Sequence, residues 1–317
     1  MKILITGGAG FIGSHLADKL LSRGDNVVVI DNFNDYYNPE QKKSNIKEAQ
    51  KNKSSYKLYK EDILSMDKLD AIFTKEKPEF VVHLAARVGV RPSIKDPHLY
   101  NDVNVKGTIN MLELARKFKV KNFVFASSSS VYGANKKIPF SEDDKTDRPI
   151  SPYGATKKAG ELLCYSYHSL HNMNTTCLRF FTVYGERGRP DMAPLKFTKL
   201  ISSGEEIEMF GDGRTKRDYT YVGDIVSGVV SAIDRQLGYE IINLGNSETV
   251  ELQKLISVIE KQVGKKAKVK QSPMQMGDIE STYADITKAK RILGFTPKVK
   301  IEEGIKRLVN WYRAQKE

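Results

Sequence analysis

The 317-residue sequence has only two cysteines, a single tryptophan and no long hydrophobic run. Cys164 and Cys177 lack the spacing of a metal site. The N-terminus reads as a strand that runs into glycines, which is not the pattern of a signal peptide. We therefore expect no metal site and a cytoplasmic protein with reduced thiols. No apolar stretch approaches the roughly 18 residues that cross a membrane, so we also expect no membrane partner.

The chain is basic, with 51 lysines and arginines against 39 acidic residues and a formal net charge of +12. In residues 41–60 and 264–270 the lysines are interspersed with acidic residues rather than concentrated on one element. A nucleic-acid-binding protein gathers its positive charge on one face. The pattern therefore indicates a solvated surface that favours anionic ligands, with no nucleic-acid partner.

A short apolar strand at the N-terminus runs into three glycines, Gly7, Gly10 and Gly13, and a helical pattern follows. Gly7 permits a tight turn, Gly10 lets the backbone approach phosphates, and Gly13 lets the helix pack close to the strand. The helix N-terminus, at Phe11 and Ile12, attracts the anion. A plain glycine turn is the alternative, but the flanking strand and helix predict a dinucleotide site.

Continuous apolar runs alternate with helical patterns along the first half of the chain. After the opening strand, strands are expected at 26–30, 56–60, 80–84, 122–126 and 175–179, and long helices at 100–118 and 153–171. Uninterrupted apolar runs are typical of strands covered on both faces. The predicted fold is therefore α/β, a doubly wound parallel sheet of the Rossmann type.

The pattern becomes irregular beyond Arg179, where glycine and proline are dense between residues 185 and 213. A helix at 222–234, a strand at 240–244 and a final helix at 302–313 follow. We expect an NAD-binding domain over 1–180 and a smaller α/β substrate domain over 181–317. Residues 222–244 are the one later segment with a pattern suited to rejoining the first sheet.

Asp31 ends the second predicted strand. A carboxylate there hydrogen-bonds the adenosine ribose and repels a 2′-phosphate, and the following Asn32 offers that phosphate no cation. This favours NAD over NADP, although a simple turn aspartate is the alternative. Asp62 and Ile63 end the third strand, where the adenine edge would lie. Further candidate cofactor contacts follow the fourth strand, at Leu84, Ala85 and Ala86.

Tyr153 and Lys157 form a Tyr-x-x-x-Lys motif, and this spacing places both side chains on one face of a helix. A free phenol has a pKa near ~10, and a neighbouring ammonium would lower that pKa by favouring phenolate. The spacing alone is not specific, because Tyr56 and Tyr132 also precede a lysine by four positions. Only Tyr153 begins a long helix soon after a strand with a polar end, which predicts a catalytic base.

The fifth predicted strand leads into four consecutive serines at 127–130. Hydroxyl groups at the carboxyl end of a central strand line the crevice where ligands bind in such sheets. A serine there can orient a substrate hydroxyl toward the tyrosine base. A hydroxyl-rich turn is the alternative for any single serine of the run.

The glycine turn, the serine run before Val131-Tyr132-Gly133 and the Tyr153-x-x-x-Lys157 motif together resemble the extended short-chain dehydrogenase/reductases. The resemblance covers essentially the whole chain. Within that family the chain is similar to nucleotide-sugar 4-epimerases of the UDP-glucuronate type, above all in residues 86–93 and 179–194.

The resemblance implies a role for each matching residue. Ser128 would bond the sugar 4-hydroxyl, Tyr153 would be the base, and Lys157 would activate it and bind the nicotinamide ribose. The implied substrate contacts are Thr182 and Arg189 for a sugar carboxylate, Arg217 for the diphosphate, Asp278 for the uridine ribose, and Met192, Lys196 and Phe197 for the uracil and phosphate. Further implied substrate-binding residues are Arg87, Arg91, Ser129 and Ser130.

The implied reaction is inversion of carbon 4 through transient oxidation by NAD. Related 4,6-dehydratases carry an Asp-Glu pair, and decarboxylating relatives a Glu, where this chain has Ser129 and Ser130. The alternatives are an epimerase of UDP-glucose or UDP-N-acetylglucosamine, a UDP-glucuronate decarboxylase, and an NAD-sensing regulatory module, which would have no use for the Tyr/Lys pair. A homodimer through the helices at 100–118 and 153–171 is also implied.

Overall fold

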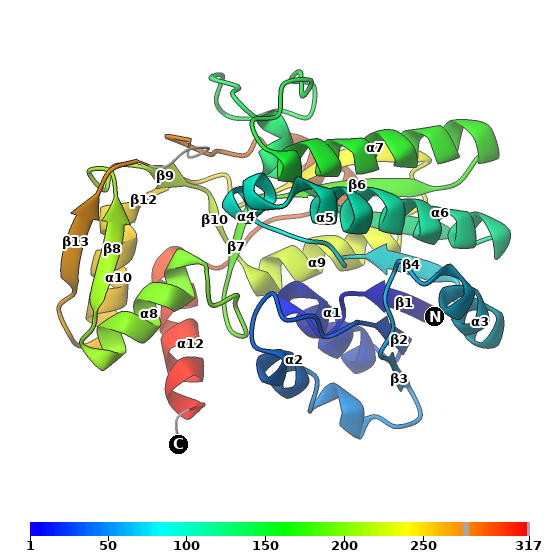
Figure 1. The fold of residues 1–317 in the computed structure, drawn as a ribbon, viewed down its shortest axis with the longest axis horizontal. Helices are drawn as coiled ribbons and strands as arrows, with labels where there is room; N and C mark the ends of the chain where they lie inside the picture. Colours follow the sequence, from blue (N-terminus) through cyan, green and yellow to red (C-terminus); the bar gives the residue numbers. More distant parts are fainter. Residues whose placement is uncertain (275–278, 316–317) are drawn as a thin grey trace.

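The computed structural model describes residues 1–274 and 279–315. Within these ranges the chain forms a seven-stranded sheet in the order β11-β6-β5-β4-β1-β2-β3, and every neighbouring pair is parallel (Figure 1). The strands are β1 (Lys2–Thr6), β2 (Asn26–Ile30), β3 (Tyr56–Tyr59), β4 (Phe80–His83), β5 (Asn122–Ser128), β6 (Thr175–Phe180) and β11 (Tyr239–Leu244). The predicted doubly wound α/β sheet is confirmed.

Helices cover both faces of the sheet because successive strand residues point to opposite sides. Ile3 and Ile5 of β1 pack in the core that includes α1 and α9, whereas Leu4 between them packs in the core that includes α3, α6 and α7. The covering helices are α1 (Phe11–Ser22), α9 (Val222–Ile233), α3 (Met66–Glu76), α6 (Gly107–Lys117) and α7 (Pro152–His171).

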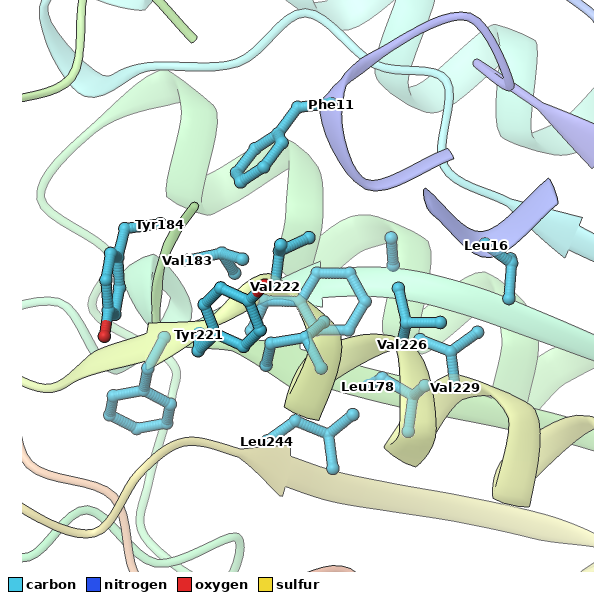
Figure 2. Packing of buried hydrophobic residues seen from close by; sticks show 14 of the residues in the cluster. Phe11, Leu16, Leu178, Val183, Tyr184, Tyr221, Val222, Val226, Val229 and Leu244 are labelled. Atoms are coloured by element: carbon cyan, nitrogen blue, oxygen red, sulfur yellow. The ribbon is translucent and has the colours of Figure 1, made fainter. Parts of the chain in front are cut away.

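The helix α9 connects the sheet with the C-terminal elements through one continuous core. Figure 2 shows Val222, Val226 and Val229 of this helix close to Leu178 of β6 and Leu244 of β11. The same buried cluster extends to Leu308 of α12. The C-terminal elements therefore share their hydrophobic core with one face of the sheet.

Among the residues that the structure describes, the remaining C-terminal elements form three two-stranded sheets and a group of helices. Strands β7 and β10 pair in parallel, as do β8 and β13, whereas β9 and β12 are antiparallel. These strands are β7 (Thr182–Tyr184), β8 (Glu206–Phe210), β9 (Lys216–Arg217), β10 (Tyr219–Tyr221), β12 (Val250–Glu251) and β13 (Lys268–Ser272). The helices are α8 (Ala193–Ser203), α10 (Leu252–Val263), α11 (Thr287–Leu293) and α12 (Ile301–Ala314).

Two predicted stretches differ from the structure. The segment read as irregular contains α8 and β8, because Pro194 occupies the first turn of α8 and Gly204, at φ +77°, ends it. The single helix expected at 100–118 is divided into α5, a π-helical turn and α6. The shorter elements are α2 (Pro39–Asn45), η1 (Ala49–Lys51), α4 (Val90–Lys95), α5 (Pro97–Asn101), η2 (Asp102–Lys106) and η3 (Ser129–Tyr132).

The strand order creates a crevice beside β1. The chain moves from β1 outward to β2 and β3, and then returns to place β4 on the other side of β1. Loops that leave neighbouring strands in opposite directions leave room at the carboxyl ends of the strands, and ligands bind at this point in open α/β sheets. Among the described residues no helix is long and apolar enough to span a membrane.

Candidate active site

A cavity of about 380 Å³ opens at the carboxyl ends of the central strands. It brings together residues that are far apart in the sequence, from the glycine turn, the serine run, α7 and the loop after β7. The predicted residues that line it are Gly7, Gly10, Phe11, Ile12, Gly13, Asp31, Asn32, Ile63, Leu84, Ala85, Ala86, Ser128, Ser129, Ser130, Tyr153, Lys157, Thr182, Arg189 and Met192.

The glycine turn at the cavity has no space for a side chain at Gly7 or at Gly13. Gly7 has φ +70°, and a Cβ there would lie 2.9 Å from the backbone nitrogen of Ala85. A Cβ on Gly13 would lie 2.3 Å from the carbonyl oxygen of Gly7. Gly10 is the N-cap of α1 and gives its first turn no side-chain cap. The first backbone N–H groups of α1 are therefore left for an anionic ligand.

Asp31 lies buried at the end of β2, next to the glycine turn. Its carboxylate accepts hydrogen bonds from the backbone N–H groups of Ala9 at 3.0 Å and Phe33 at 2.9 Å. Burial raises the pKa of the Asp31 carboxyl, and these two bonds and the charge of Lys42 oppose that shift. Asn32 beside it donates to Asp62 at 2.7 Å. The carboxylate is thus fixed beside the turn, as a ribose ligand requires.

Tyr153 and Ser128 meet at the cavity from different elements, the first turn of α7 and the end of β5. Burial raises the pKa of the Tyr153 phenol, while a side-chain hydrogen bond with Ser128 and the positive charge of Arg189 lower it. Ser128 also bonds the Ser130 hydroxyl at 3.2 Å. The ring of Tyr100 packs edge-on to Tyr153, with the centroids 6.2 Å apart. The phenol is thus held by packing and by one serine.

Lys157 lies one turn further along α7 and is buried. Its ammonium donates to the carbonyl oxygen of Ala126 at 2.8 Å and lies 5.1 Å from the centroid of the Phe125 ring. Burial lowers the pKa of Lys157 to about 7. The sequence predicts that this ammonium lowers the pKa of Tyr153, but in the structure burial raises that pKa, and the groups that oppose burial are Ser128 and Arg189. Lys157 therefore contacts β5 directly, and its pKa lies close to neutral pH.

Arg189 lines the same cavity, and its positive charge lowers the pKa of Tyr153. Its guanidinium forms a two-point ion pair with Asp191, with Nε–Oδ1 at 3.1 Å and Nη2–Oδ2 at 2.5 Å. The Tyr36 ring lies 5.6 Å from the guanidinium carbon, and its hydroxyl donates to Asp191 at 3.5 Å. Such a fork also matches the geometry of a ligand carboxylate.

Several predicted residues lie away from the cavity lining. Arg87 is held by its backbone, which exchanges hydrogen bonds with the Asn104 side chain at 2.8 and 2.9 Å. The Arg91 guanidinium stacks on Phe210 at 4.7 Å, and Phe197 is buried in the core. The others outside the lining are Asp62, Lys196 and Arg217, and Asp278 lies outside the described residues. Their roles stay predictions.

The cavity also contains residues that the sequence reasoning missed. Tyr36, Tyr37 and Lys42 follow β2 and line it, as do Gly89 and Phe181. Lys42 donates to the carbonyl oxygen of Asn34 at 2.8 Å. No periodic pattern marks residues 32–38, so the density of tyrosine and asparagine after a strand that ends in an acid was the only available signal.

Comparisons with known proteins agree with this geometry. A family model described as GDP-mannose 4,6 dehydratase matches residues 4–308. An uncharacterized protein of Methanocaldococcus jannaschii is 49% identical over 100% of this chain and 97% of its own length. A UDP-glucuronate 4-epimerase of Thermodesulfobacterium geofontis is 45% identical over 97% of this chain and 95% of its own length.

A solved structure shows the same similarity in three dimensions. The crystal structure of UDP-glucuronic acid 4-epimerase from Bacillus cereus, in complex with UDP-glucuronic acid and NAD, matches with a TM-score of 0.93 and 38% identity. The match covers 99% of this chain and 100% of that chain. The resemblance inferred from the motifs is thereby confirmed, and the chain belongs to the GDP-mannose 4,6-dehydratase family of extended short-chain dehydrogenase/reductases.

Proposed function

We propose that this protein is an isomerase, an NAD-dependent UDP-glucuronate 4-epimerase that interconverts UDP-glucuronate and UDP-galacturonate. The observation that carries the proposal is that Tyr153, Ser128 and Arg189 line one cavity, where Ser128 and the charge of Arg189 both act to lower the pKa of the Tyr153 phenol. The relatives named for this activity, and the Bacillus cereus structure with UDP-glucuronic acid and NAD, support it.

The dinucleotide part of the cavity fits NAD on the geometry of this chain. The side-chain-free turn at Gly7 and Gly13 and the uncapped start of α1 suit a pyrophosphate. The Asp31 carboxylate suits the adenosine ribose and disfavours a 2′-phosphate. The residues that would hold NAD are Gly7, Gly10, Phe11, Ile12, Gly13, Asp31, Asn32, Asp62, Ile63, Leu84, Ala85, Ala86, Tyr153 and Lys157.

The chain supplies acid–base chemistry at carbon 4 of the sugar. Tyr153 as phenolate accepts the proton of the 4-hydroxyl, and Ser128 orients that hydroxyl and stabilises the phenolate. Lys157 is fixed on β5 by its bond to the carbonyl oxygen of Ala126, and by the family resemblance it would activate Tyr153 and bind the nicotinamide ribose. Bound NAD would supply the hydride acceptor and donor for carbon 4, so that the hydride taken from one face of the sugar is returned to the other.

A carboxylate on the sugar must be held away from the new carbonyl. The 4-keto intermediate of a glucuronate is a β-keto acid, which loses carbon dioxide when its carboxylate bond aligns with the carbonyl π system. Thr182, Arg189 and the hydroxyls of Ser129 and Ser130 border the same cavity and would hold the carboxylate out of that alignment. The serines supply no acid–base pair for dehydration or decarboxylation.

The nucleotide half of the substrate is assigned to the C-terminal elements. Met192 lines the cavity at the start of α8, with Lys196 one turn further along that helix. Arg217 lies on β9, where its Nη1 donates to the carbonyl oxygen of Lys216 at 2.8 Å. By the family resemblance we assign these residues, with Phe197 and Asp278, to the diphosphate, uracil and uridine ribose. Arg87 and Arg91 are assigned to the UDP-sugar substrate as a whole.

Incubation with a panel of UDP-sugars and product analysis by NMR tests the function. The proposal predicts conversion of UDP-glucuronate into UDP-galacturonate without release of carbon dioxide. Faster conversion of UDP-glucose or UDP-N-acetylglucosamine would assign the enzyme to neutral sugars instead. Carbon dioxide and a UDP-pentose would identify a decarboxylase, and absence of turnover with retained NAD binding would favour a regulatory module.

We also propose a homodimer that forms through α6 and α7. Leu162 and Tyr165 on α7 expose 55% and 53% of their surface, although large apolar side chains usually avoid water when they cluster on one helix face. Leu162→Glu combined with Tyr165→Glu should convert the dimer into monomers in analytical ultracentrifugation. Val269→Glu on β13 is the matched control, because Val269 is also an exposed apolar residue. An unchanged dimer in the double variant would refute the interface.

This assignment gives each part of the chain its own ligand. Residues 1–180 would bind NAD, residues 181–317 the UDP-sugar, and residues 222–244 carry α9 and β11 on the sheet of the first part. The free, buried thiols of Cys164 and Cys177 support a reducing compartment, the cytoplasm.

A further inference from the structure

A buried ion pair lies beneath the catalytic groups and has no part in the chemistry described above. Arg179 of β6 and Glu161 of α7 form a two-point contact, with Nε–Oε1 at 2.8 Å and Nη2–Oε2 at 2.9 Å. Their side chains are only 1% and 0% exposed. Taking two charges out of water is costly, so a pair at this depth requires a reason.

The pair contacts one residue on each side of Ser128, Ser129 and Ser130 in the sequence. The Ser127 hydroxyl donates to Glu161 Oε1 at 2.6 Å. At the other end, the guanidinium carbon of Arg179 lies 4.8 Å from the centroid of the Tyr132 ring. The Tyr132 hydroxyl in turn donates to Asn243 at 2.7 Å. The hydroxyl groups of residues 128–130 are thus bracketed between two residues that one ion pair holds.

The pair also connects α7 with two strands, because Arg179 lies on β6 and Glu161 contacts Ser127 of β5. Tyr153, Lys157 and Glu161 are four positions apart and share one face of α7. Along that face Lys157 donates to the carbonyl oxygen of Ala126 and Glu161 accepts from the Ser127 hydroxyl, while Tyr153 lines the same cavity as Ser128. Two hydrogen bonds therefore connect successive turns of the helix to neighbouring residues of the strand, and the next residue of that strand is Ser128.

A buried ion pair is better suited to fixing how the helix lies on the strand than to raising the stability of the fold. Apolar helix–strand packing tolerates small sliding, whereas a buried fork of two hydrogen bonds has a single register. Within the described part of the chain, the Arg179 Nη1 atom has no hydrogen-bond partner, so the pair is not fully satisfied. Lys158 adds a second positive charge at 3.3 Å from Glu161 Oε2.

We propose that Glu161 and Arg179 are positioning residues, which set the register of α7 on β5 and thereby hold the Tyr153 hydroxyl at Ser128. They act through Ser127 and Tyr132 and touch no substrate atom. The inference rests on the proposed function for the role of Tyr153, but the geometry that it predicts is independent of which sugar is turned over.

The test replaces the pair by apolar side chains of similar volume, Glu161→Leu with Arg179→Met. Such replacements of buried ion pairs are often neutral or stabilising, so the double variant should unfold thermally at or near the wild-type temperature. Its kcat should fall by about tenfold or more while KM for the UDP-sugar changes little, because a small misplacement of a catalytic group slows chemistry. Wild-type kcat in a folded double variant would overturn the inference.

A spectroscopic measurement makes the test independent of turnover. The ultraviolet titration of Tyr153, isolated as the difference from a Tyr153→Phe partner in each background, should move to higher pH in the double variant, since the bond with Ser128 is weakened. An unchanged titration would contradict the proposed register even if no UDP-sugar were a substrate.

Two single variants complete the design. Ser127→Ala removes only the hydroxyl that Glu161 binds and should shift the tyrosine titration in the same direction, which keeps the test decisive if the double variant does not fold. Lys158→Met removes the outer contact to Glu161, and because that side chain is partly exposed it should leave both kcat and the titration unchanged. A Ser127→Ala variant with wild-type kcat and titration would overturn the inference.

Discussion

Tyr153 is the residue on which the proposed chemistry depends most directly. Tyr153→Phe removes the acid–base group and keeps the ring that packs against Tyr100, so the fold and NAD binding should persist. The expected loss in kcat is about 10²–10⁴-fold, the usual contribution of a positioned acid–base group. Steady-state epimerisation rates and the amount of NAD that co-purifies measure the two effects.

A second tyrosine provides the matched control for this prediction. Tyr56 shows the same spacing to a lysine, but it lies in β3, and its buried hydroxyl has no hydrogen-bond partner in the described ranges. Tyr56→Phe should therefore retain wild-type activity. Epimerisation by Tyr153→Phe at the rate of Tyr56→Phe would remove Tyr153 from the mechanism.

Arg189 is the residue that should distinguish an acidic sugar from a neutral one. A charge-assisted fork contributes about 1.5–3 kcal/mol, so Arg189→Ala should lower kcat/KM for UDP-glucuronate by about 10- to 100-fold more than for UDP-glucose. The structure also shows Asp191 on this guanidinium, which a ligand carboxylate would have to share or displace. Rates on the two sugars measure the difference.

The neighbouring Arg187 controls for a general loss of positive charge. It pairs with Asp18 of α1 at 2.6 Å. Arg187→Ala should reduce the rates on both sugars equally, whatever its effect on stability. Equal losses on both sugars in Arg189→Ala as well would remove the carboxylate role of Arg189.

At the scale of elements, the start of α1 has no room for an added side chain at Gly13. Gly13→Ala places a methyl group 2.3 Å from the Gly7 carbonyl oxygen and must displace the helix from β1. We expect most of the bound NAD to be lost, together with a lower melting temperature, both measured on the purified protein. Ser22→Ala, at the exposed end of the same helix, should change neither. Full NAD content in Gly13→Ala would show that the turn does not hold the cofactor.

Sequence predicts an element well where its signal is local. The strand 26–30 was predicted with the bounds of β2, because its apolar run is closed by polar residues on both sides. The helix α8 was missed, because Pro194 and Gly204 were interpreted as irregular structure although they mark its first turn and its end. Proline and glycine are ambiguous in this way until the packing of the intervening residues is known.

The candidate site shows the same limit. Gly7, Asp31 and Tyr153 were found because each has a fixed place relative to a strand or a helix. The ion pair of Arg189 with Asp191 and the approach of Tyr36 depend on how separate loops pack, and no spacing in the sequence encodes that.

At the scale of the whole molecule, buried charge sets the response of stability to pH. Burial lowers the pKa of His83 from 6.5 to about 3. The unfolded chain binds a proton below pH 6.5 while the folded protein does not. Above pH 6.5 His83 therefore does not lower the free energy of unfolding. As the pH drops from 6.5 toward 3, His83 lowers it by about 1.4 kcal/mol per pH unit. Asp218, whose pKa burial raises to about 6, has the opposite effect between pH 6 and 3.8.

The His83 contribution is isolated by comparing variants. In urea unfolding, wild type should lose stability relative to His83→Gln as the pH falls below 6.5, because glutamine does not titrate. His98→Gln is the control, since His98 is exposed on α5. A constant difference between wild type and His83→Gln from pH 7 to 5 would contradict burial of a neutral imidazole.

The central claim is that carbon 4 is oxidised and reduced again within one closed site. Incubation with UDP-glucuronate that carries deuterium at carbon 4 tests it directly, with the product followed by NMR and mass spectrometry. The account predicts UDP-galacturonate that retains the deuterium at carbon 4, because NAD accepts and returns the same atom. Loss of the label to water, or a labelled UDP-pentose with carbon dioxide, would contradict it.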